Sequence, residues 1–258
     1  MKILVNGILG HMGKEVVKLC ESGYRGAELY AGVDPFVKEG EPLPVFSSFS
    51  DIVDSSSIDC IVDFSHHSLT ETMLAFACER KLPVVVATTG HTNEELELIK
   101  AASAEIPIFF SYNMSLGIAL LVELAKKTAA AMPEADIEII EKHHNRKIDA
   151  PSGTAIMLAN AIKTVRPDSY ANTGRSGHAK RDEREIGIHA VRMGNVVGEH
   201  EVIISTANQT LSLKHEAHSR SLFAEGAIAA AEYLIACSQG LYDMNSLVTD
   251  SNREPVLK

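Results

Sequence analysis

The chain has 258 residues, of which 45% are hydrophobic and 22% charged, a composition typical of a globular protein with one large domain or two modest ones. Lysine and arginine total 24 against 34 aspartates and glutamates, a net charge of -10. This argues against nucleic-acid and membrane-surface partners but leaves a small anionic ligand open, and the apolar content excludes a disordered chain.

The first part of the chain alternates short apolar runs with helical patterns. Strands are predicted over residues 2–6, 28–34, 60–64, 83–87 and 106–110. Helices are predicted over residues 13–21 and 69–80, and from an N-cap at Asn93 to about residue 103. Continuous β-branched strands separated by helices indicate a parallel sheet covered on both faces. We therefore expect an α/β domain of the doubly wound kind over residues 1–114.

The pattern changes after Asn113. A long helix is predicted over about residues 116–132, and strands with two-residue alternation follow over residues 136–142, 185–192, 196–205 and 210–216. A short helix near residues 154–163 and a basic loop over residues 175–184, to which the sequence assigns no role, lie between them. An alanine-rich helix is predicted over residues 221–238. Alternating strands indicate a sheet with one open or paired face, so a second domain is expected.

Compartment signals are few. The four cysteines form no C-x-x-C pair, which argues against a disulfide framework and a zinc ribbon. Met1 leads straight into an apolar strand without a signal-peptide pattern, and no stretch reaches the roughly 18 apolar residues of a membrane span. We expect a cytoplasmic protein without a membrane partner.

A glycine-rich turn follows the first strand. Gly7, Gly10 and Gly13 form G-x-x-G-x-x-G, which permits a tight turn and a close approach of a pyrophosphate to a helix N-terminus. Asp34 ends the second strand, about twenty residues further on, where an acidic residue binds the adenosine ribose. Together they predict dinucleotide binding. A carboxylate repels a 2′-phosphate, so Asp34 favours NADH, while nearby Lys38 leaves NADPH open.

Two more loops follow strands of the first domain, at residues 87–91 and 111–114. Ligands bind at the carboxyl ends of the strands in open α/β sheets. The small and hydroxyl-bearing residues of these loops suit a nicotinamide and its ribose.

The segment 141–155, E-K-H-H-N-R-K-I-D-A-P-S-G-T-A, carries the densest chemistry. Strand alternation places Glu141 and His143 on one face and His144 on the other, so the two histidines have different roles unless the chain turns between them. An imidazole can be a general acid or base near neutral pH. Lys147 can donate a proton or bind an anion.

A helix start follows this segment. Ser152 is a good N-cap, so the backbone amides of Gly153 and Thr154 are predicted to form an anion site that suits a carboxylate.

Two other kinds of site are disfavoured. His143, His144 and Asp149 are metal-ligand types, but adjacent histidines diverge on a strand and no H-E-x-x-H spacing occurs, so no catalytic metal is expected. No G-x-S-x-G supports a serine triad.

These residues resemble the 4-hydroxy-tetrahydrodipicolinate reductase (dihydrodipicolinate reductase) family of the bacterial diaminopimelate and lysine pathway. The most specific match is E-x-H-H-x-x-K-x-D-A-P-S-G-T-A over residues 141–155. Supporting matches are the glycine turn with Met12, T-T-G at 88–90, I-H-A-V-R at 188–192, G-E-H at 198–200 and H-S-R at 218–220. The resemblance covers the whole chain.

The resemblance implies a Rossmann-like parallel-sheet nucleotide-binding domain over residues 1–114, with the C-terminal segment 217–258 packing back on it. It implies a second α+β domain with a mixed four-stranded sheet over residues 115–216 that binds substrate and assembles a homotetramer. The implied reaction is NAD(P)H-dependent reduction of a cyclic imine dicarboxylate to tetrahydrodipicolinate, with NADH or NADPH as cofactor.

The resemblance also implies residue roles. His143 is the expected catalytic acid or base and Lys147 the expected proton donor. The expected substrate contacts are His144, Gly153, Thr154 and Arg220. The expected cofactor contacts are Gly7, Ile8, Leu9, Gly10, His11, Met12, Asp34, Ala87, Thr88, Thr89, Ser111, Tyr112, Asn113 and Met114.

The chain departs from the family pattern at three places. His11 stands where the glycine turn often has arginine, and Pro35 and Phe36 stand where an arginine commonly follows the acidic residue. Both changes remove partners for a 2′-phosphate and favour NADH. Met114 replaces a more usual phenylalanine. Two alternatives remain open: an amino-acid-type dehydrogenase with the same domain plan, which the Lys147–Thr154 block disfavours, and a nucleotide-sensing protein, which His143 and Lys147 disfavour.

Overall fold

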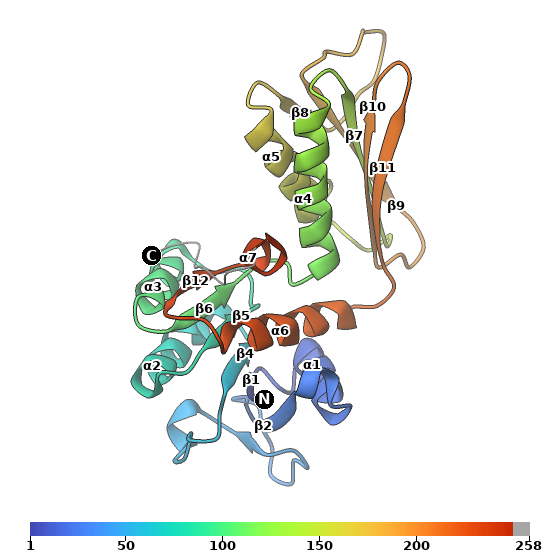
Figure 1. Cartoon of the computed structure of the whole chain (residues 1–258). Helices are drawn as coiled ribbons and strands as arrows, with labels where there is room; N and C mark the ends of the chain where they lie inside the picture. Colours follow the sequence, from blue (N-terminus) through green and yellow to red (C-terminus); the bar gives the residue numbers. More distant parts are fainter. Residues whose placement is uncertain (250–258) are drawn as a thin grey trace. The chain divides into compact units, whose positions relative to one another are not determined.

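The computed structural model describes residues 1–249, which form two compact units (Figure 1). Of the described residues, 1–116 and 221–249 belong to one unit, and 117–220 belong to the other. Part of the C-terminal segment that the sequence assigned to the first domain, residues 250–258, lies outside the described residues. No helix among residues 1–249 is long and apolar enough to cross a membrane.

The first unit is built on a parallel sheet. Its strands, in spatial order, are β12 (Gly240–Tyr242), β6 (Pro107–Phe110), β5 (Val84–Val86), β4 (Cys60–Asp63), β1 (Lys2–Asn6), β2 (Glu28–Val33) and β3 (Val45–Phe46). Every neighbouring pair is parallel. The five strands predicted from apolar runs are present, whereas β3 and β12 are too short to give such a signal. The Rossmann-like sheet is confirmed.

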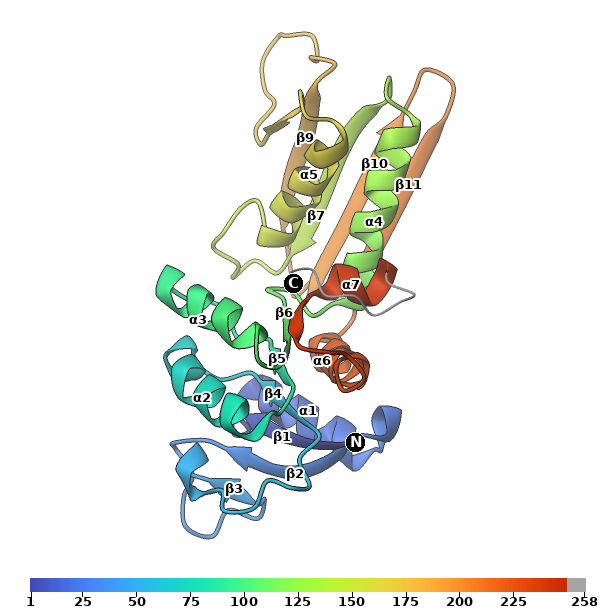
Figure 2. The same ribbon diagram turned by 60° about the vertical axis from the view of Figure 1, so that its left-hand side comes forward.

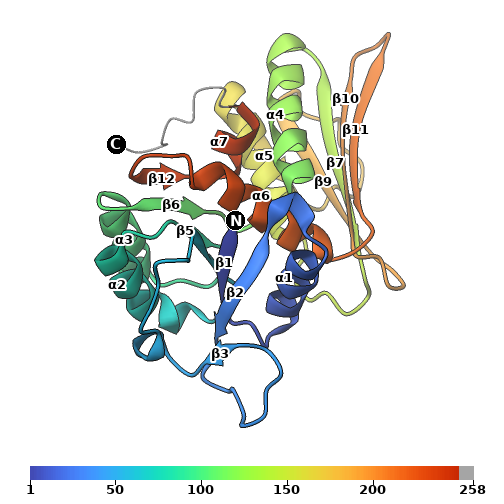
Figure 3. The same ribbon diagram turned by 60° about the horizontal axis from the view of Figure 1, so that its bottom comes forward.

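Helices cover both faces of this sheet. They are α1 (His11–Glu21), α2 (Thr70–Arg80), α3 (Asn93–Ser103), α6 (Ser221–Leu234) and α7 (Met244–Thr249), with short 3-10 turns at Tyr24–Gly26, Phe49–Asp51 and His67–Leu69. Helices α2 and α3 lie on one face, and α1 and α6 lie on the other (Figures 2 and 3). Alanines make up much of α6, and their small side chains let it pack closely against β4, β5 and β6.

The start of α3 and the end of α6 differ from the predictions. Thr92, not Asn93, is the N-cap of α3, because its hydroxyl accepts from the Glu95 amide while the Glu95 carboxylate accepts from the Thr92 amide. Helix α6 ends at Leu234 rather than at residue 238. The residues after it lead into β12, which pairs with β6.

The second unit contains a mixed sheet of five strands. In spatial order these are β11 (Thr210–Ala217), β10 (Gly198–Ser205), β7 (Asp136–His143), β9 (Glu185–Arg192) and β8 (Tyr170–Asn172). Strand β7 is antiparallel to β10 and parallel to β9. The prediction of four strands is wrong, since β8 adds an edge strand. This strand has three largely exposed residues and no apolar alternation, so the sequence carries no signal for it.

Two helices cover one face of the mixed sheet. Helices α4 (Leu116–Ala131) and α5 (Gly153–Val165) enclose a core with the inward side chains of β7, β9 and β10 (Figure 2). On β7, Ile137, Ile139 and Glu141 are buried while the residues between them are only partly covered. The two-residue alternation therefore sends Glu141 toward the helices, at the end of an otherwise apolar row.

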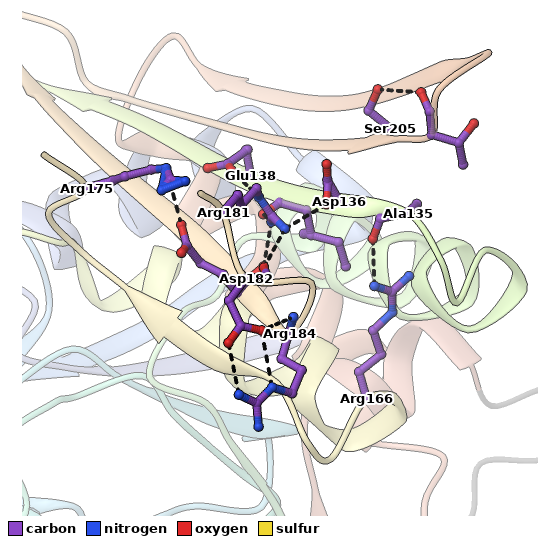
Figure 4. A network of polar contacts seen from close by, with 12 residues as sticks. Ala135, Asp136, Glu138, Arg166, Arg175, Arg181, Asp182, Arg184 and Ser205 are labelled. Carbon is purple, nitrogen blue, oxygen red and sulfur yellow. Dashed lines mark hydrogen bonds and ion pairs between the residues drawn. The ribbon is translucent and has the colours of Figure 1, made fainter. Parts of the chain in front are cut away.

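The basic loop 175–184 owes its position mainly to one arginine (Figure 4). Arg181 donates to the carboxylates of Asp136 at 2.7 Å and Glu138 at 3.1 Å, and to the Ile137 carbonyl at 3.0 Å. Arg184 pairs instead with Asp182, in the same loop, at 2.9 Å. The sequence assigned this loop no role, and the contacts of Arg181 fasten it to β7.

Candidate active site

The glycine turn joins β1 to α1. Gly7 has φ +80°, and a Cβ there would lie 2.6 Å from the Phe64 carbonyl oxygen. A Cβ on Gly13 would overlap the Gly7 carbonyl oxygen and lie 2.7 Å from the Ile8 Cα. Helix α1 has no side-chain N-cap and no acidic residue in its first turn. Its first amides lack intrahelical acceptors, so the turn fits a phosphate group.

Asp34 follows β2 and is almost fully buried. Its Oδ2 accepts from the Leu9 amide at 3.1 Å, and its Oδ1 accepts from the Phe36 amide at 3.0 Å. The carboxylate therefore supports the glycine turn, and it follows β2 at the position from which an acidic residue binds the ribose in dinucleotide-binding folds.

A cavity of about 290 Å³ opens at the carboxyl edge of the parallel sheet. Six of the predicted cofactor residues line it: Met12, Ala87, Thr88, Thr89, Tyr112 and Met114. Three lining residues were missed: Phe64, Ser65 and Phe223. The first two follow β4 and carry the same strand-end signal as the predicted loops, whereas Phe223 lies on α6, far away in sequence.

The other predicted cofactor residues do not line this cavity. Gly7, Gly10 and His11 belong to the turn, and the fully buried Ile8 side chain packs against Gly32. Only the backbone of Ile8 is therefore available to a ligand. In the loop after β6, the Ser111 hydroxyl donates to the Asn113 carbonyl at 2.9 Å, and the Asn113 side-chain oxygen accepts from the Ser115 amide at 2.9 Å. These bonds fix the shape of the loop.

Buried polar side chains tie β1 to β4 beneath the turn. Asn6 Nδ2 donates to Asp63 Oδ1 at 2.8 Å and to the Ser65 hydroxyl at 2.9 Å. Burial raises the pKa of the Asp63 carboxyl, which hydrogen bonds from Ser65, Thr88 and Asn6 only partly offset. This cluster holds the loop that supplies Phe64 and Ser65 to the cavity wall.

In the second unit, the side chain of Glu141 is fully buried, and its carboxylate contacts several residues of the candidate site. Arg192 binds it through both terminal nitrogens, at 2.7 and 2.8 Å, and His143 Nδ1 lies 2.6 Å from Oε2. The Ser152 amide donates to Oε1 at 3.0 Å. Burial alone would raise the pKa of Glu141, but these hydrogen bonds outweigh it and hold the pKa below its usual value.

Ser152 is the N-cap of α5, as predicted. Its hydroxyl accepts from the Ala155 amide at 3.3 Å and lies 3.1 Å from His200 Nε2. The first turn of α5 has no acidic residue, so the amides at Gly153 and Thr154 suit an anion. Burial lowers the pKa of His200 to about 4, so this imidazole is neutral at physiological pH.

The remaining predicted substrate residues lie in or beside the turn after β7. Strand β7 ends at His143, and His144 begins the turn. Lys147 Nζ pairs with Asp149 Oδ1 at 2.8 Å. The pKa of His144 is lowered by desolvation and then by the cationic Arg146 and Arg220, so Arg220 contributes positive potential at His144.

Other cationic residues of the 142–147 segment point elsewhere. Lys142 pairs with Glu199 at 3.1 Å, on the opposite face of β7 from Glu141. Arg146 is exposed and donates to Asn195 at 2.6 Å. Sequence reasoning assigned no role to Glu141, Arg192 or His200, although the alternation along β7 placed Glu141 beside His143. Within residues 1–249, no group of three histidine, cysteine or acidic side chains is arranged to hold a metal ion.

Comparison with known proteins identifies the family. The model for the dihydrodipicolinate reductase N-terminus matches residues 1–114, and that for the dihydrodipicolinate reductase C-terminus matches residues 117–248. The chain belongs to the dihydrodipicolinate reductase family. Membership makes it an oxidoreductase and supports a nicotinamide cofactor.

Similar proteins extend over nearly the whole chain. The 4-hydroxy-tetrahydrodipicolinate reductase of Clostridium novyi (strain NT) is 42% identical over 97% of this chain and 99% of its own length. That of Caldanaerobacter subterraneus subsp. tengcongensis is 45% identical over 96% and 98%, respectively. Dipicolinate-bound dihydrodipicolinate reductase from Paenisporosarcina sp. TG-14 has the same fold, with a TM-score of 0.78 at 24% identity, covering 96% of this chain and 99% of that one.

Proposed function

We propose that this protein reduces 4-hydroxy-tetrahydrodipicolinate to tetrahydrodipicolinate, in lysine and diaminopimelate biosynthesis, with NADH or NADPH. The observation that carries the proposal is the side chain of His143, tied to a buried carboxylate that also binds the first residue of an anion-binding helix start. An acid–base group beside a carboxylate site is what reduction of an imine dicarboxylate requires. The named relatives perform this reaction.

The first unit is the proposed cofactor domain. Its glycine turn leaves no room for a Cβ at Gly7 or Gly13, and the strand-end cavity has the small and apolar lining that a nicotinamide needs. When bound, the nicotinamide supplies the hydride, and the protein supplies orientation and charge.

NADH is the proposed preferred form. The Asp34 carboxylate would repel a 2′-phosphate. Neither His11 nor the exposed Pro35 and Phe36 supplies the guanidinium that such a phosphate favours.

The second unit is the proposed substrate and assembly domain. The amides of Gly153 and Thr154 bind one substrate carboxylate, and His144 and Arg220 supply further contacts with the anionic substrate. We further propose a homotetramer formed through the second unit, a cytoplasmic location, and no nucleic-acid or membrane partner.

His143 and Lys147 are the proposed catalytic pair. Replacing the 4-hydroxyl group by hydrogen consumes one hydride and one proton and releases water. An imidazole held through Nδ1 can exchange a proton at Nε2, and the Lys147 ammonium can donate one. The two alternatives remain less well supported, because a nucleotide sensor needs no acid–base pair and an amino-acid dehydrogenase does not account for the 147–154 block.

A coupled assay tests this function. Pyruvate and aspartate semialdehyde are condensed freshly by the upstream synthase, and oxidation of NADH and NADPH is followed at 340 nm on adding the protein. We expect oxidation that depends on the synthase and is faster with NADH at subsaturating cofactor. No oxidation with either cofactor would exclude the proposed substrate.

A further inference from the structure

The two oxygens of Glu141 divide their partners evenly. Oε2 accepts from Arg192 at 2.8 Å and from His143 Nδ1 at 2.6 Å. Oε1 accepts from Arg192 at 2.7 Å and from the Ser152 amide at 3.0 Å. Each oxygen thus contacts one arginine nitrogen and one part of the candidate site.

We propose that Glu141, clamped by Arg192, is a positioning residue that holds the His143 imidazole and the start of α5 in one fixed geometry. The inference rests on the proposed function, in which His143 exchanges protons and α5 binds a substrate carboxylate. Glu141 itself is fully buried and acts through these two partners.

The carboxylate also determines which nitrogen of His143 carries the proton. An ionised carboxylate can only accept a hydrogen bond, so Nδ1 of His143 is the donor and Nε2 is the nitrogen left to exchange a proton. The space beside Nε2 is kept by Gly198, where a Cβ would lie 3.2 Å away. The neighbouring imidazole of His200, 5.2 Å from that of His143 between ring centroids, is neutral because burial lowers its pKa to about 4.

Arg192 extends the clamp toward Lys147. Besides binding Glu141, its Nη2 donates to the Asp149 carbonyl at 2.6 Å. The Asp149 side chain pairs with Lys147 at 2.8 Å. Arg192 therefore links the carboxylate beneath His143 to the segment that carries the second proposed catalytic group.

Glu141→Gln tests the proposal, because it keeps the shape of the side chain and removes its charge. Glu138→Gln is a matched control: Glu138 lies on the same strand, faces the other way, and binds an arginine and a histidine, Arg181 at 3.1 Å and His189 at 2.8 Å. Each variant is made in the wild-type and His143→Ala backgrounds. For each we would measure kcat, KM for both substrates, the thermal midpoint, and the Kd for dipicolinate, a stable planar dicarboxylate, by calorimetry.

Glu141→Gln is expected to lower kcat by tenfold or more, toward the 10²–10⁴-fold that acid–base catalysis contributes. KM for NADH should stay within about twofold, and the dipicolinate Kd should rise about tenfold, as for loss of one charge-assisted tether. In the His143→Ala background Glu141→Gln should have little further effect on kcat, because residues acting through one another are not additive. Glu138→Gln should leave kcat and Kd unchanged.

Two outcomes would overturn the positioning role. One is a wild-type kcat and dipicolinate Kd in folded Glu141→Gln protein. The other is a loss of kcat that multiplies with that of His143→Ala, as expected for a general structural effect. If the wild-type protein oxidises no cofactor, the proposed function fails, and the dipicolinate comparison between Glu141→Gln and Glu138→Gln still decides whether Glu141 positions the anion site.

Discussion

The Asp34 carboxylate accepts a hydrogen bond from the Leu9 amide at 3.1 Å. The residue proposed to select the cofactor by charge therefore also supports the glycine turn that is proposed to bind the cofactor phosphates. Substitutions at Asp34 must separate these two effects.

Asp34→Asn should change the cofactor preference without loosening the turn. The amide oxygen still accepts from Leu9, and the charge that repels a 2′-phosphate is gone. The side-chain NH2 group cannot accept from the Phe36 amide, so the hydrogen bond after β2 is lost while the one to the turn is kept. We expect the ratio of NADPH to NADH affinity to rise about tenfold, which corresponds to about 1.4 kcal/mol. Fluorescence titration with both cofactors measures this ratio. Asp34→Ala, which also removes the acceptor for Leu9, should weaken binding of both, and an unchanged ratio in Asp34→Asn would argue against Asp34 as the selector.

Gly13→Ala should destabilise the first unit. The added Cβ meets the Gly7 carbonyl and Ile8 backbone, which cannot move as a flexible side chain can. Overpacking of this kind costs about 1–3 kcal/mol, measured as a lower urea midpoint. Gly174→Ala is the control, since no heavy atom lies within 4 Å of its Cβ position and its φ is not positive. Equal midpoints for the two variants would contradict the role of Gly13.

Lys147→Met should abolish most turnover while leaving the cofactor site intact. Loss of a proton donor lowers kcat by about 10²–10⁴-fold, and the NADH Kd should change less than twofold. Lys142→Met, five residues away, removes a lysine that pairs with Glu199 on the opposite face of β7 and should keep nearly full activity. Steady-state kinetics on both variants test the assignment, and an active Lys147→Met protein would be incompatible with it.

Arg181→Met should destabilise the second unit far more than Arg184→Met. Arg181 is 18% exposed and binds two carboxylates and backbone carbonyls of β7 and β9, and loss of such charge-assisted bonds costs about 2–4 kcal/mol. Arg184 is 62% exposed and pairs with Asp182 alone, so its loss should cost less than about 1 kcal/mol. Thermal unfolding of both variants gives the comparison, and similar midpoints would show that Arg181 does not fasten the loop.

His200 should make the protein less stable as the pH falls below 6.5. Its pKa is about 4 in the folded protein because of burial, against 6.5 in the unfolded chain. Between these values the unfolded chain binds a proton that the folded protein refuses, so the free energy of unfolding decreases as pH falls and levels off below pH 4. The loss is at most about 3.5 kcal/mol, at about 1.4 kcal/mol for each tenfold change in proton affinity.

His200→Gln should remove this contribution while keeping a hydrogen bond to Ser152. Urea unfolding of both proteins from pH 7 to pH 4 would show the wild-type protein losing stability relative to the variant as the pH falls. Parallel curves would mean that His200 binds a proton equally well in the folded and unfolded protein.

The sequence by itself predicted the parallel sheet, the glycine turn, the place of Asp34 at the end of β2 and the N-cap at Ser152. Each of these depends on neighbours in the chain, through apolar periodicity, turn geometry or capping. It was insufficient for β8 and β12, which have three residues each and are defined by pairing with distant strands. The same holds for Phe223, which lines the cavity at the carboxyl edge of the parallel sheet from α6.

The candidate site also has features set by neighbours in the chain and features set by distant strands. Alternation along β7 placed Glu141 and His143 on one face from sequence alone. Only the tertiary structure brought Arg192 to Glu141 across 51 residues of sequence, because the parallel pairing of β9 with β7 sets His143 opposite Arg192. It also placed Lys142 on the face of β7 opposite Glu141, where Lys142 pairs with Glu199. Local patterns determine which way a side chain points, whereas strand pairing decides which distant charge it meets, and here that charge keeps a fully buried carboxylate ionised beneath the proposed acid–base group.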